Sequence, residues 1–166
     1  MYEERFMRRA IELSKSALTR PGTKPFGGVV VKDGEIVGEG LNHSLEHLDP
    51  TSHGEVEAIR DACRRLRTLD LTGAHMYAST EPCALCVAAM VLTGFARLYY
   101  AASLDQAARI QAKVKSGPGD PVVDPWALRD EAGSPVDRRR IRSEQKLDAA
   151  AVGVLEEWAA QKKGVA

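Results

Sequence analysis

Three residues with good metal-ligand chemistry stand in a short, ordered pattern. His53 is followed two positions later by Glu55, and Cys83 and Cys86 stand further along the chain. A structural zinc site closes with four protein ligands, whereas a catalytic site has three and leaves one position for water. One histidine and two cysteines therefore predict a catalytic Zn²⁺ site. Glu55 is close enough in sequence to touch that water without binding the metal.

These residues predict a hydrolytic reaction. Zinc lowers the pKa of a bound water, so hydroxide becomes available near neutral pH. The H-x-E and P-C-x-x-C pattern resembles the signature of zinc deaminases. By that resemblance, Glu55 would take the proton from the water and deliver it to a ring nitrogen, while hydroxide attacks the carbon that bears an amine. A second proton transfer to the leaving nitrogen would release ammonia.

A Cys-x-x-Cys pair by itself also occurs in zinc ribbons and in redox proteins. A ribbon requires a second pair of ligands, and the only other cysteine is Cys63, on an apolar helical stripe. There a buried small hydrophobe is favoured over a reactive thiol. A redox pair would leave His53 and Glu55 without a role, so the catalytic zinc site is the favoured interpretation.

The spacing of apolar residues predicts the elements that hold this site. An Asp-Gly pair at residues 33–34, between two strand-like runs, predicts a tight hairpin. Helical patterns and strand-like runs alternate along the chain, which predicts an α/β fold with a central sheet covered on both faces. Expected helices cover residues 5–19, 53–67, 84–92, 104–113 and 149–162, and expected strands cover 26–32, 35–38, 74–78 and 97–101.

Two of these helices begin at the predicted ligands, His53 and Cys83. Their positive ends would meet at the metal, which lowers the pKa of a thiol. Downstream we expect a Pro/Gly-rich loop over 117–135 and a charged edge strand over 138–144. The chain reads as a single domain over 1–166 in which residues 115–166 are a C-terminal loop-and-helix extension.

Composition and charge limit the expected partners and location. Lys plus Arg and Asp plus Glu number 23 each, so the formal net charge is zero and no overall positive field would hold nucleic acid. The first residues are too charged for a signal peptide, and no apolar run approaches membrane length. Three cysteines, two of them in the metal pattern, indicate a reducing compartment. We therefore expect a cytoplasmic protein with no membrane partner.

Four further motifs lie at residues 25–34, 40–42, 49–56 and 79–83. Together they resemble the cytidine deaminase-like superfamily, in the branch that holds bacterial guanine deaminases, fungal cytosine deaminases and tRNA adenosine deaminases. The resemblance implies a three-layer α/β/α sandwich with a mixed five-stranded sheet, assembled as a homodimer or larger homo-oligomer. It also implies that the three predicted ligands bind zinc and that Glu55 shuttles the proton.

The resemblance assigns two further residues to substrate binding. Asn42 matches an asparagine that grips the polar edge of the substrate, although an Asn after a glycine in a loop is also a common turn former. Phe26 matches an aromatic residue that lines the pocket, although a core position at the start of a strand is an equal alternative.

Residues 99–102, together with Asp105, resemble the guanine deaminase branch. That branch carries an aromatic-Asp-Asp stretch whose acid reads the guanine edge, and here residues 112–114 are Ala, Lys and Val. Position 54 is a glycine, where many relatives have alanine, and in this the chain is similar to the fungal cytosine deaminases. We therefore expect a small amino-heterocycle other than guanine, such as a cytosine analogue, an azacytosine or s-triazine ring, or a modified purine.

Two other functions remain open on the sequence. A tRNA adenosine deaminase would share the metal pattern, and the arginines at 138–140 and 142 could supply part of a basic channel. The zero net charge and the long tail disfavour it. A non-catalytic zinc-stabilised binding module would have no use for Glu55 beside an open ligand position.

Overall fold

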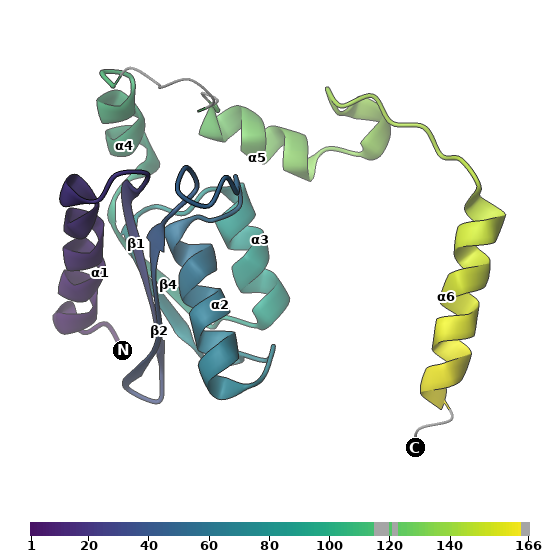
Figure 1. The fold of residues 1–166 in the computed structure, drawn as a ribbon, viewed down its shortest axis with the longest axis horizontal. Coiled ribbons are helices and arrows are strands. Elements are labelled where there is room, and N and C mark those ends of the chain that lie inside the picture. The colour runs from purple at the N-terminus through teal and green to yellow at the C-terminus, as the bar shows by residue number, and fades with distance from the viewer. Residues whose placement is uncertain (115–119, 121–122, 164–166) are drawn as a thin grey trace. The chain divides into compact units, whose positions relative to one another are not determined.

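A computed structural model of the chain describes residues 1–114, 120 and 123–163 (Figure 1). The chain divides into two compact units, Met1–Arg129 and Asp130–Ala166. The elements up to the boundary are α1 (Glu4–Ser16), the 3₁₀ helix η1 (Ala17–Thr19), β1 (Lys24–Lys32), β2 (Glu35–Asn42), α2 (Gly54–Leu66), β3 (His75–Thr80), α3 (Ala84–Thr93), β4 (Arg97–Ala102) and α4 (Leu104–Gln111). They are followed by α5 (Pro125–Gly133), which crosses the boundary, and then by the 3₁₀ helix η2 (Val136–Arg138) and α6 (Asp148–Lys163).

The first unit is built on a mixed sheet with strand order β2-β1-β3-β4. β1 runs antiparallel to both of its neighbours, whereas β3 and β4 are parallel. The predicted hairpin joins β1 to β2 through Asp33 and Gly34, whose φ angles are 53° and 81°. Positive φ at both turn residues matches the twist of the flanking strands, and Asp-Gly supplies it at low cost.

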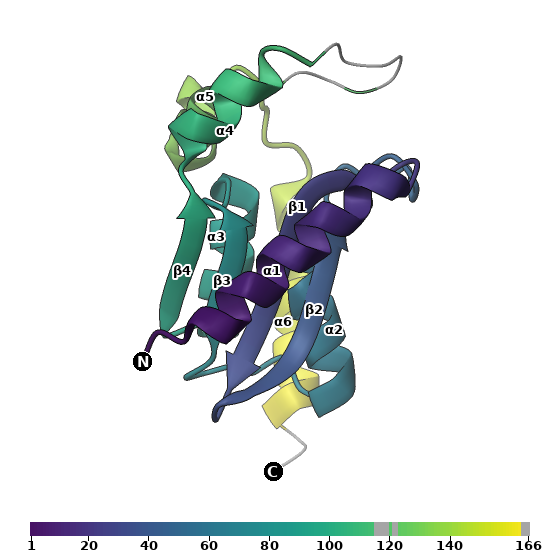
Figure 2. The ribbon, with the colours of Figure 1, turned by 90° about the vertical axis from the view of Figure 1, so that its left-hand side faces the viewer.

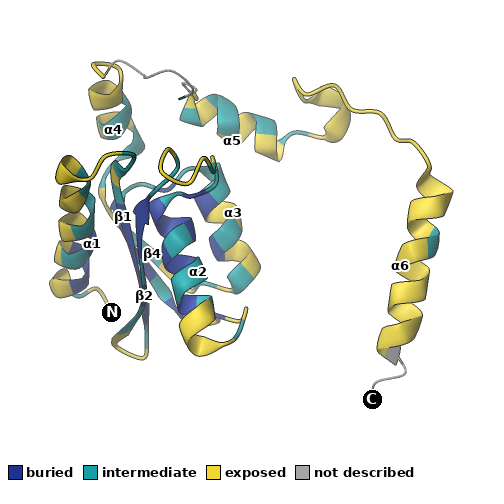
Figure 3. Ribbon diagram, in the orientation of Figure 1, coloured by how far each residue is buried: buried dark blue, intermediate teal, exposed yellow. Residues whose placement is uncertain are grey.

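Helices cover both faces of this sheet (Figure 2). Alternate residues of β1 point to opposite faces, so Val29 and Val31 pack with Phe6 and Ala10 of α1. Val30 packs on the other face, in a cluster with residues of α2, β3 and α3. Burial is concentrated between these layers (Figure 3). The expected α/β fold with three layers is confirmed.

The expected number of strands is wrong: the described residues form four strands, not five. The segment 138–144, predicted as a charged edge strand, begins in η2 and continues without strand pairing. Its side chains are exposed, and a strand without a paired neighbour has no ladder of hydrogen bonds to hold it.

The predicted loop over 117–135 contains α5. Asp124 Oδ1 accepts hydrogen bonds from the backbone N–H groups of Trp126 and Ala127 at 2.9 and 3.4 Å. Pro125 occupies the first helical position, where its missing N–H is harmless. The start of this loop, residues 117–119, and residues 121–122 lie outside the described part of the chain.

The second unit is mostly exposed in its described residues. Val154, Leu155 and Trp158 of α6 are all more than half exposed. Among the described residues, none of the helices combines the length and the hydrophobicity that a membrane span requires. The single domain with a C-terminal extension stays a prediction.

Candidate active site

His53 stands directly before the first turn of α2. Its backbone is extended, with φ −79° and ψ 153°, and the helix begins at Gly54, one residue later than predicted. The carbonyl oxygen of His53 accepts a 2.8 Å hydrogen bond from the N–H of Glu57. The His53 side chain makes no capping hydrogen bond with α2, and its ring faces Cys83 and Cys86 instead.

Cys83 occupies the same position at the start of α3. Its backbone is extended, with φ −73° and ψ 172°, and the helix begins at Ala84. Cys86 lies in the first turn of α3 and is fully buried. Two helix N-termini therefore converge on the three predicted ligands, as the sequence predicted.

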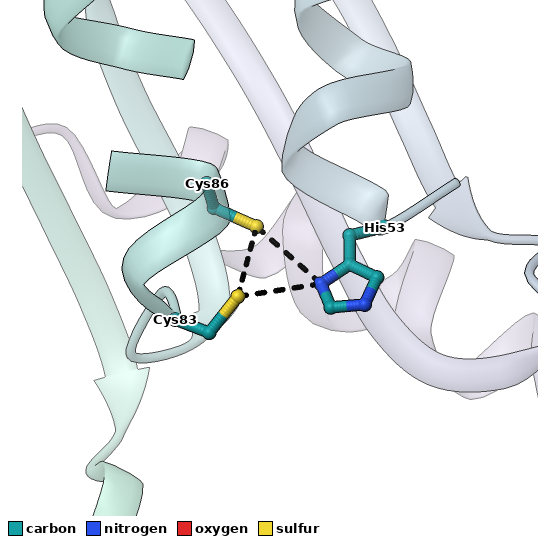
Figure 4. Close-up of side chains that lie close together, drawn as sticks. All are labelled: His53, Cys83 and Cys86. Atoms are coloured by element: carbon teal, nitrogen blue, oxygen red, sulfur yellow. Dashed lines mark hydrogen bonds between the residues drawn. The ribbon is translucent and has the colours of Figure 1, made fainter. Parts of the chain in front are cut away.

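The three ligand atoms form a nearly regular triangle (Figure 4). His53 Nδ1 lies 3.5 Å from Cys83 Sγ and 3.6 Å from Cys86 Sγ, and the two sulfurs are 3.7 Å apart. Tetrahedral zinc with ordinary Zn–N and Zn–S bond lengths needs edges of about 3.6 Å between N and S and about 3.8 Å between two sulfurs. The donors thus have the type and the spacing of a tetrahedral zinc site.

Electrostatics at this site favour a bound cation. Hydrogen bonding with Cys86 lowers the pKa of the Cys83 thiol to about 4 and raises that of Cys86, so the pair shares one proton. The hydrogen bond to Cys83 raises the pKa of His53. A metal ion would replace the shared proton as the positive partner of the sulfurs.

Glu55 lies in the first turn of α2 and points at the same triangle. Its side chain is buried, and its Oε2 accepts a hydrogen bond from the Cys86 thiol at 3.4 Å. Burial is the main reason that its pKa is raised above the ordinary glutamate value. A carboxyl group that touches the donor set from inside the protein is placed to exchange protons with a reactant there.

A network of polar side chains shapes the loop before His53. Arg60 of α2 donates to Glu57 Oε1 at 2.5 Å and to Thr51 Oγ1 at 3.1 Å. Asp49 Oδ1 accepts from both the N–H and the hydroxyl of Thr51, and Ser52 Oγ donates to Glu57 at 2.8 Å. The sequence marked residues 49–52 as a motif but did not identify Arg60, because its role depends on helix packing.

Asn42 ends β2 and is buried. Its Oδ1 accepts hydrogen bonds from the N–H and the hydroxyl of Ser44 at 3.1 and 2.9 Å, so it does form a turn. The N–H of the next residue, His43, donates to Ser52 O at 3.0 Å, which brings the end of β2 beside the loop that leads to His53. Among the described residues no hydrogen bond uses Asn42 Nδ2, which leaves that donor for a ligand.

Phe26 lies in a bulge of β1. Lys24 pairs with Asn42 and Gly27 pairs with Leu41, so Phe26 falls at the irregularity between these pairs. Bulges redirect side chains and are common beside active sites. Phe26 is half-buried and belongs to neither core cluster.

Lys24, at the start of β1, forms an ion pair that the sequence did not suggest. Lys24 Nζ lies 2.7 Å from Asp120 Oδ1, across 96 positions of the chain. The hydrogen bond to Cys83 is the main reason that the pKa of His53 is raised, and the positive charge of Lys24 acts in the opposite direction. The ion pair ties Asp120 to the start of β1, and no local pattern in the sequence could have identified it.

Comparisons with known proteins bear on this site. The family described as the cytidine and deoxycytidylate deaminase zinc-binding region matches residues 1–102. A guanine deaminase of Bacillus subtilis is 40% identical over 65% of this chain and 69% of its own length. A tRNA-specific adenosine deaminase of Aquifex aeolicus is 39% identical over 61% of this chain and 67% of its own.

Solved structures have the same fold. A crystal structure of a guanine deaminase from Bacillus subtilis gives a TM-score of 0.82 at 31% identity and covers 96% of this chain and 95% of that one. A structure from work on A-to-I editing by tRNA:A34 deaminases gives a TM-score of 0.58 at 38% identity, covering 60% and 76%. The chain therefore belongs to the cytidine and deoxycytidylate deaminase family and is a hydrolytic enzyme that acts on C–N bonds.

Proposed function

We propose that His53, Cys83 and Cys86 hold a zinc ion and that Glu55 carries protons during hydrolysis. The triangle of donor atoms, with edges of 3.5, 3.6 and 3.7 Å, supports this assignment. Bound zinc supplies Lewis acidity, which makes hydroxide available near neutral pH. Glu55 would accept a proton at Oε2 from the attacking water and give it to a ring nitrogen of the substrate. It would then take the second proton of that water from the new hydroxyl group on the carbon and deliver it to the leaving amine, which departs as ammonia.

The same proposal gives Asn42 and Phe26 the task of orienting the substrate. Asn42 Oδ1 is used within the protein, so its Nδ2 would donate to a carbonyl or ring nitrogen of a heterocycle. Phe26, at its bulge, would present an apolar face to the ring. Orientation of this kind converts binding into a productive geometry for attack.

The proposed substrate is a free nucleobase or a related amino-heterocycle. The supporting observation is how much of this chain each solved structure matches. The guanine deaminase structure covers 96% of the chain, whereas the tRNA:A34 deaminase structure covers 60%. We further propose a specificity different from guanine, because residues 112–114 lack the acid expected in the guanine deaminase branch. Cytosine analogues, azacytosine or s-triazine rings and modified purines are the proposed candidates.

A tRNA adenosine deaminase is the second candidate function. Its support is the 39% identity with the Aquifex aeolicus enzyme, which nearly equals the identity with the guanine deaminase. The arginines at 138–140 and 142 could contact phosphates. A non-catalytic zinc module is disfavoured. Burying the Glu55 carboxyl group beside the donor atoms lowers the stability of the fold, and a purely structural site would gain nothing from it.

One experiment separates these functions. Purified enzyme is given guanine, cytosine, 5-azacytosine, diaminopurine and a triazine in parallel assays of ammonia release, and tRNA is assayed for inosine in the anticodon loop. We expect a non-guanine heterocycle to have the highest kcat/KM. Guanine as the best substrate by a wide margin would reject the altered specificity, and inosine formation with inert free bases would establish the tRNA function.

Homo-oligomerisation and a cytoplasmic location stay predictions. The outer side of α3 supports association, since Val91 and Leu92 are 75% and 85% exposed. Sedimentation of the purified protein would measure the oligomeric state. A monomer at micromolar concentration would contradict the prediction.

A further inference from the structure

A second group of metal-binding side chains lies in the loop between β2 and α2. The N–H of His47 donates to the carbonyl oxygen of His43 at 2.9 Å, which closes one helical turn. The two imidazole rings are therefore on the same side, stacked with centroids 4.9 Å apart and planes 17° from parallel. Histidines four positions apart on one turn are a recurrent way to hold a metal ion.

Glu46 adds a carboxylate to this pair. Its Oε2 lies 2.6 Å from His43 Nδ1, and its Oε1 accepts from Arg20 at 2.9 Å. Arg20 and His43 thus hold the two carboxylate oxygens of Glu46 from opposite partners, which fixes the carboxylate beside the imidazole pair. The backbone N–H of Glu46 is itself held by Gly22 O at 2.9 Å, which anchors the turn to the segment before β1.

Hydrogen bonding also sets the tautomer of His47. Ser52 Oγ gives its only proton to Glu57 Oε1 at 2.8 Å, so it can only accept from His47 Nδ1, which lies 3.1 Å away. The proton of neutral His47 is therefore on Nδ1, and Nε2 carries the lone pair. A histidine whose second ring nitrogen donates to a neighbouring oxygen is typical of metal ligands.

We propose that His43, Glu46 and His47 form a second metal site, for a divalent late transition metal such as zinc, nickel or copper. One donor atom from each residue lies within 4.8 Å of the others, so side-chain rotation can bring all three onto one ion. Two imidazoles and a carboxylate suit these metals, whereas magnesium and calcium prefer oxygen ligands. The proposal does not depend on the reaction proposed above.

This second site is joined to the candidate active site by its backbone. His43 follows Asn42 and binds Ser52 O, and His47 binds the side chain of Ser52, which precedes His53. An ion on His43, Glu46 and His47 would restrain the loop between Asn42 and His53. We expect added metal to raise the thermal unfolding temperature through this restraint, because a ligand that binds only the folded state stabilises it.

The test is a metal titration of untagged protein that already holds one equivalent of zinc. Calorimetry should show a second equivalent of Zn²⁺ in the wild type, which is lost in His43→Gln and in His47→Gln while the first equivalent is retained. The chain offers a matched control, since His75→Gln on β3 removes the histidine remote from both groups. A wild type that binds one equivalent only, or histidine variants that keep the second, would overturn the proposal.

Cobalt gives an independent measurement if a variant folds poorly. Cobalt held by thiolates has a sulfur-to-metal charge-transfer band, whereas cobalt held by two imidazoles and a carboxylate has none. The first equivalent of Co²⁺ added to metal-free wild-type protein should develop this band, and the second should bind without increasing it. A second equivalent that increases the band, or no second equivalent, contradicts a site made of His43, Glu46 and His47.

Discussion

The carbonyl oxygen of Phe26 lies against the Cα of Gly54, so that a methyl group on Gly54 would be 2.2 Å from it. The backbone of β1 thus passes directly beside the first turn of α2. This close approach holds the bulge that carries Phe26 next to the turn that carries Glu55. Gly54 is needed here for space, which is a physical reason for the glycine independent of any particular substrate.

We predict that Gly54→Ala destabilises the protein by about 1–3 kcal/mol, the usual cost of overpacking. The first turn of α2 would also move away from β1, so kcat/KM should fall through a displaced Glu55. Thermal unfolding and initial rates measure both effects. Gly153→Ala is the control, because nothing lies near that position in α6 and alanine favours a helix. Equal stability of the two variants would contradict the steric argument.

A pair of substitutions at Asn42 separates its two roles. Asn42→Asp keeps an oxygen that accepts from Ser44 but loses the Nδ2 donor, whereas Asn42→Ala loses both. We expect the Asp variant to fold, with a kcat/KM reduced at least about tenfold by the lost hydrogen bond. Rates and unfolding temperatures should be measured together. Near wild-type turnover in Asn42→Asp would mean that Asn42 only forms the turn.

Arg60→Ala tests the network before His53. Loss of its contacts with Glu57, Thr51 and Asp49 should cost about 1 kcal/mol, since the arginine is partly exposed, and should lower kcat/KM by loosening the loop. Arg65→Ala removes an exposed pair with Asp61 on the same helix and should cost less than about 0.5 kcal/mol. Indistinguishable kinetics for the two variants would argue against a positioning role.

His75 gives a prediction on pH. Burial, followed by repulsion from the N-terminus and Arg97, lowers its pKa below the ordinary 6.5. The unfolded chain therefore takes up this proton first, and stability is lost as the pH falls below about 6.5 through the folded pKa. His75→Gln should lose less thermal stability than the wild type between pH 8 and 5.5. A larger loss in the variant would show the opposite sign of shift.

The ligand set could be predicted because residue type and spacing are local properties. One predicted ligand, His53, stands before α2, and the Cys-x-x-Cys pair stands at the start of α3. The site therefore forms once the N-termini of these two helices meet, as they do in the structure. The hairpin at Asp33-Gly34 was predictable for the same reason, since its positive φ angles depend on two adjacent residues.

Other features depend on contacts that the sequence does not encode locally. The fifth strand expected over 138–144 fails because pairing needs a neighbour, and a charged run carries no information about one. The Lys24–Asp120 ion pair joins residues 96 positions apart. The start of α5, by contrast, could have been predicted locally, because Asp124 followed by Pro125 is a recognisable helix start. The Pro/Gly-rich composition of the segment led to the prediction of a loop instead.

The most direct test of the central claim compares zinc content and ammonia release in wild type and Glu55→Gln, using the best heterocycle from the substrate panel. Glu12→Gln, which alters an exposed carboxylate on α1, is the control. We predict unchanged zinc content in both variants and a turnover reduced about 10²- to 10⁴-fold in Glu55→Gln alone, because the ligands remain while the proton carrier is removed. Turnover within a few-fold of wild type in Glu55→Gln would contradict the proposed mechanism.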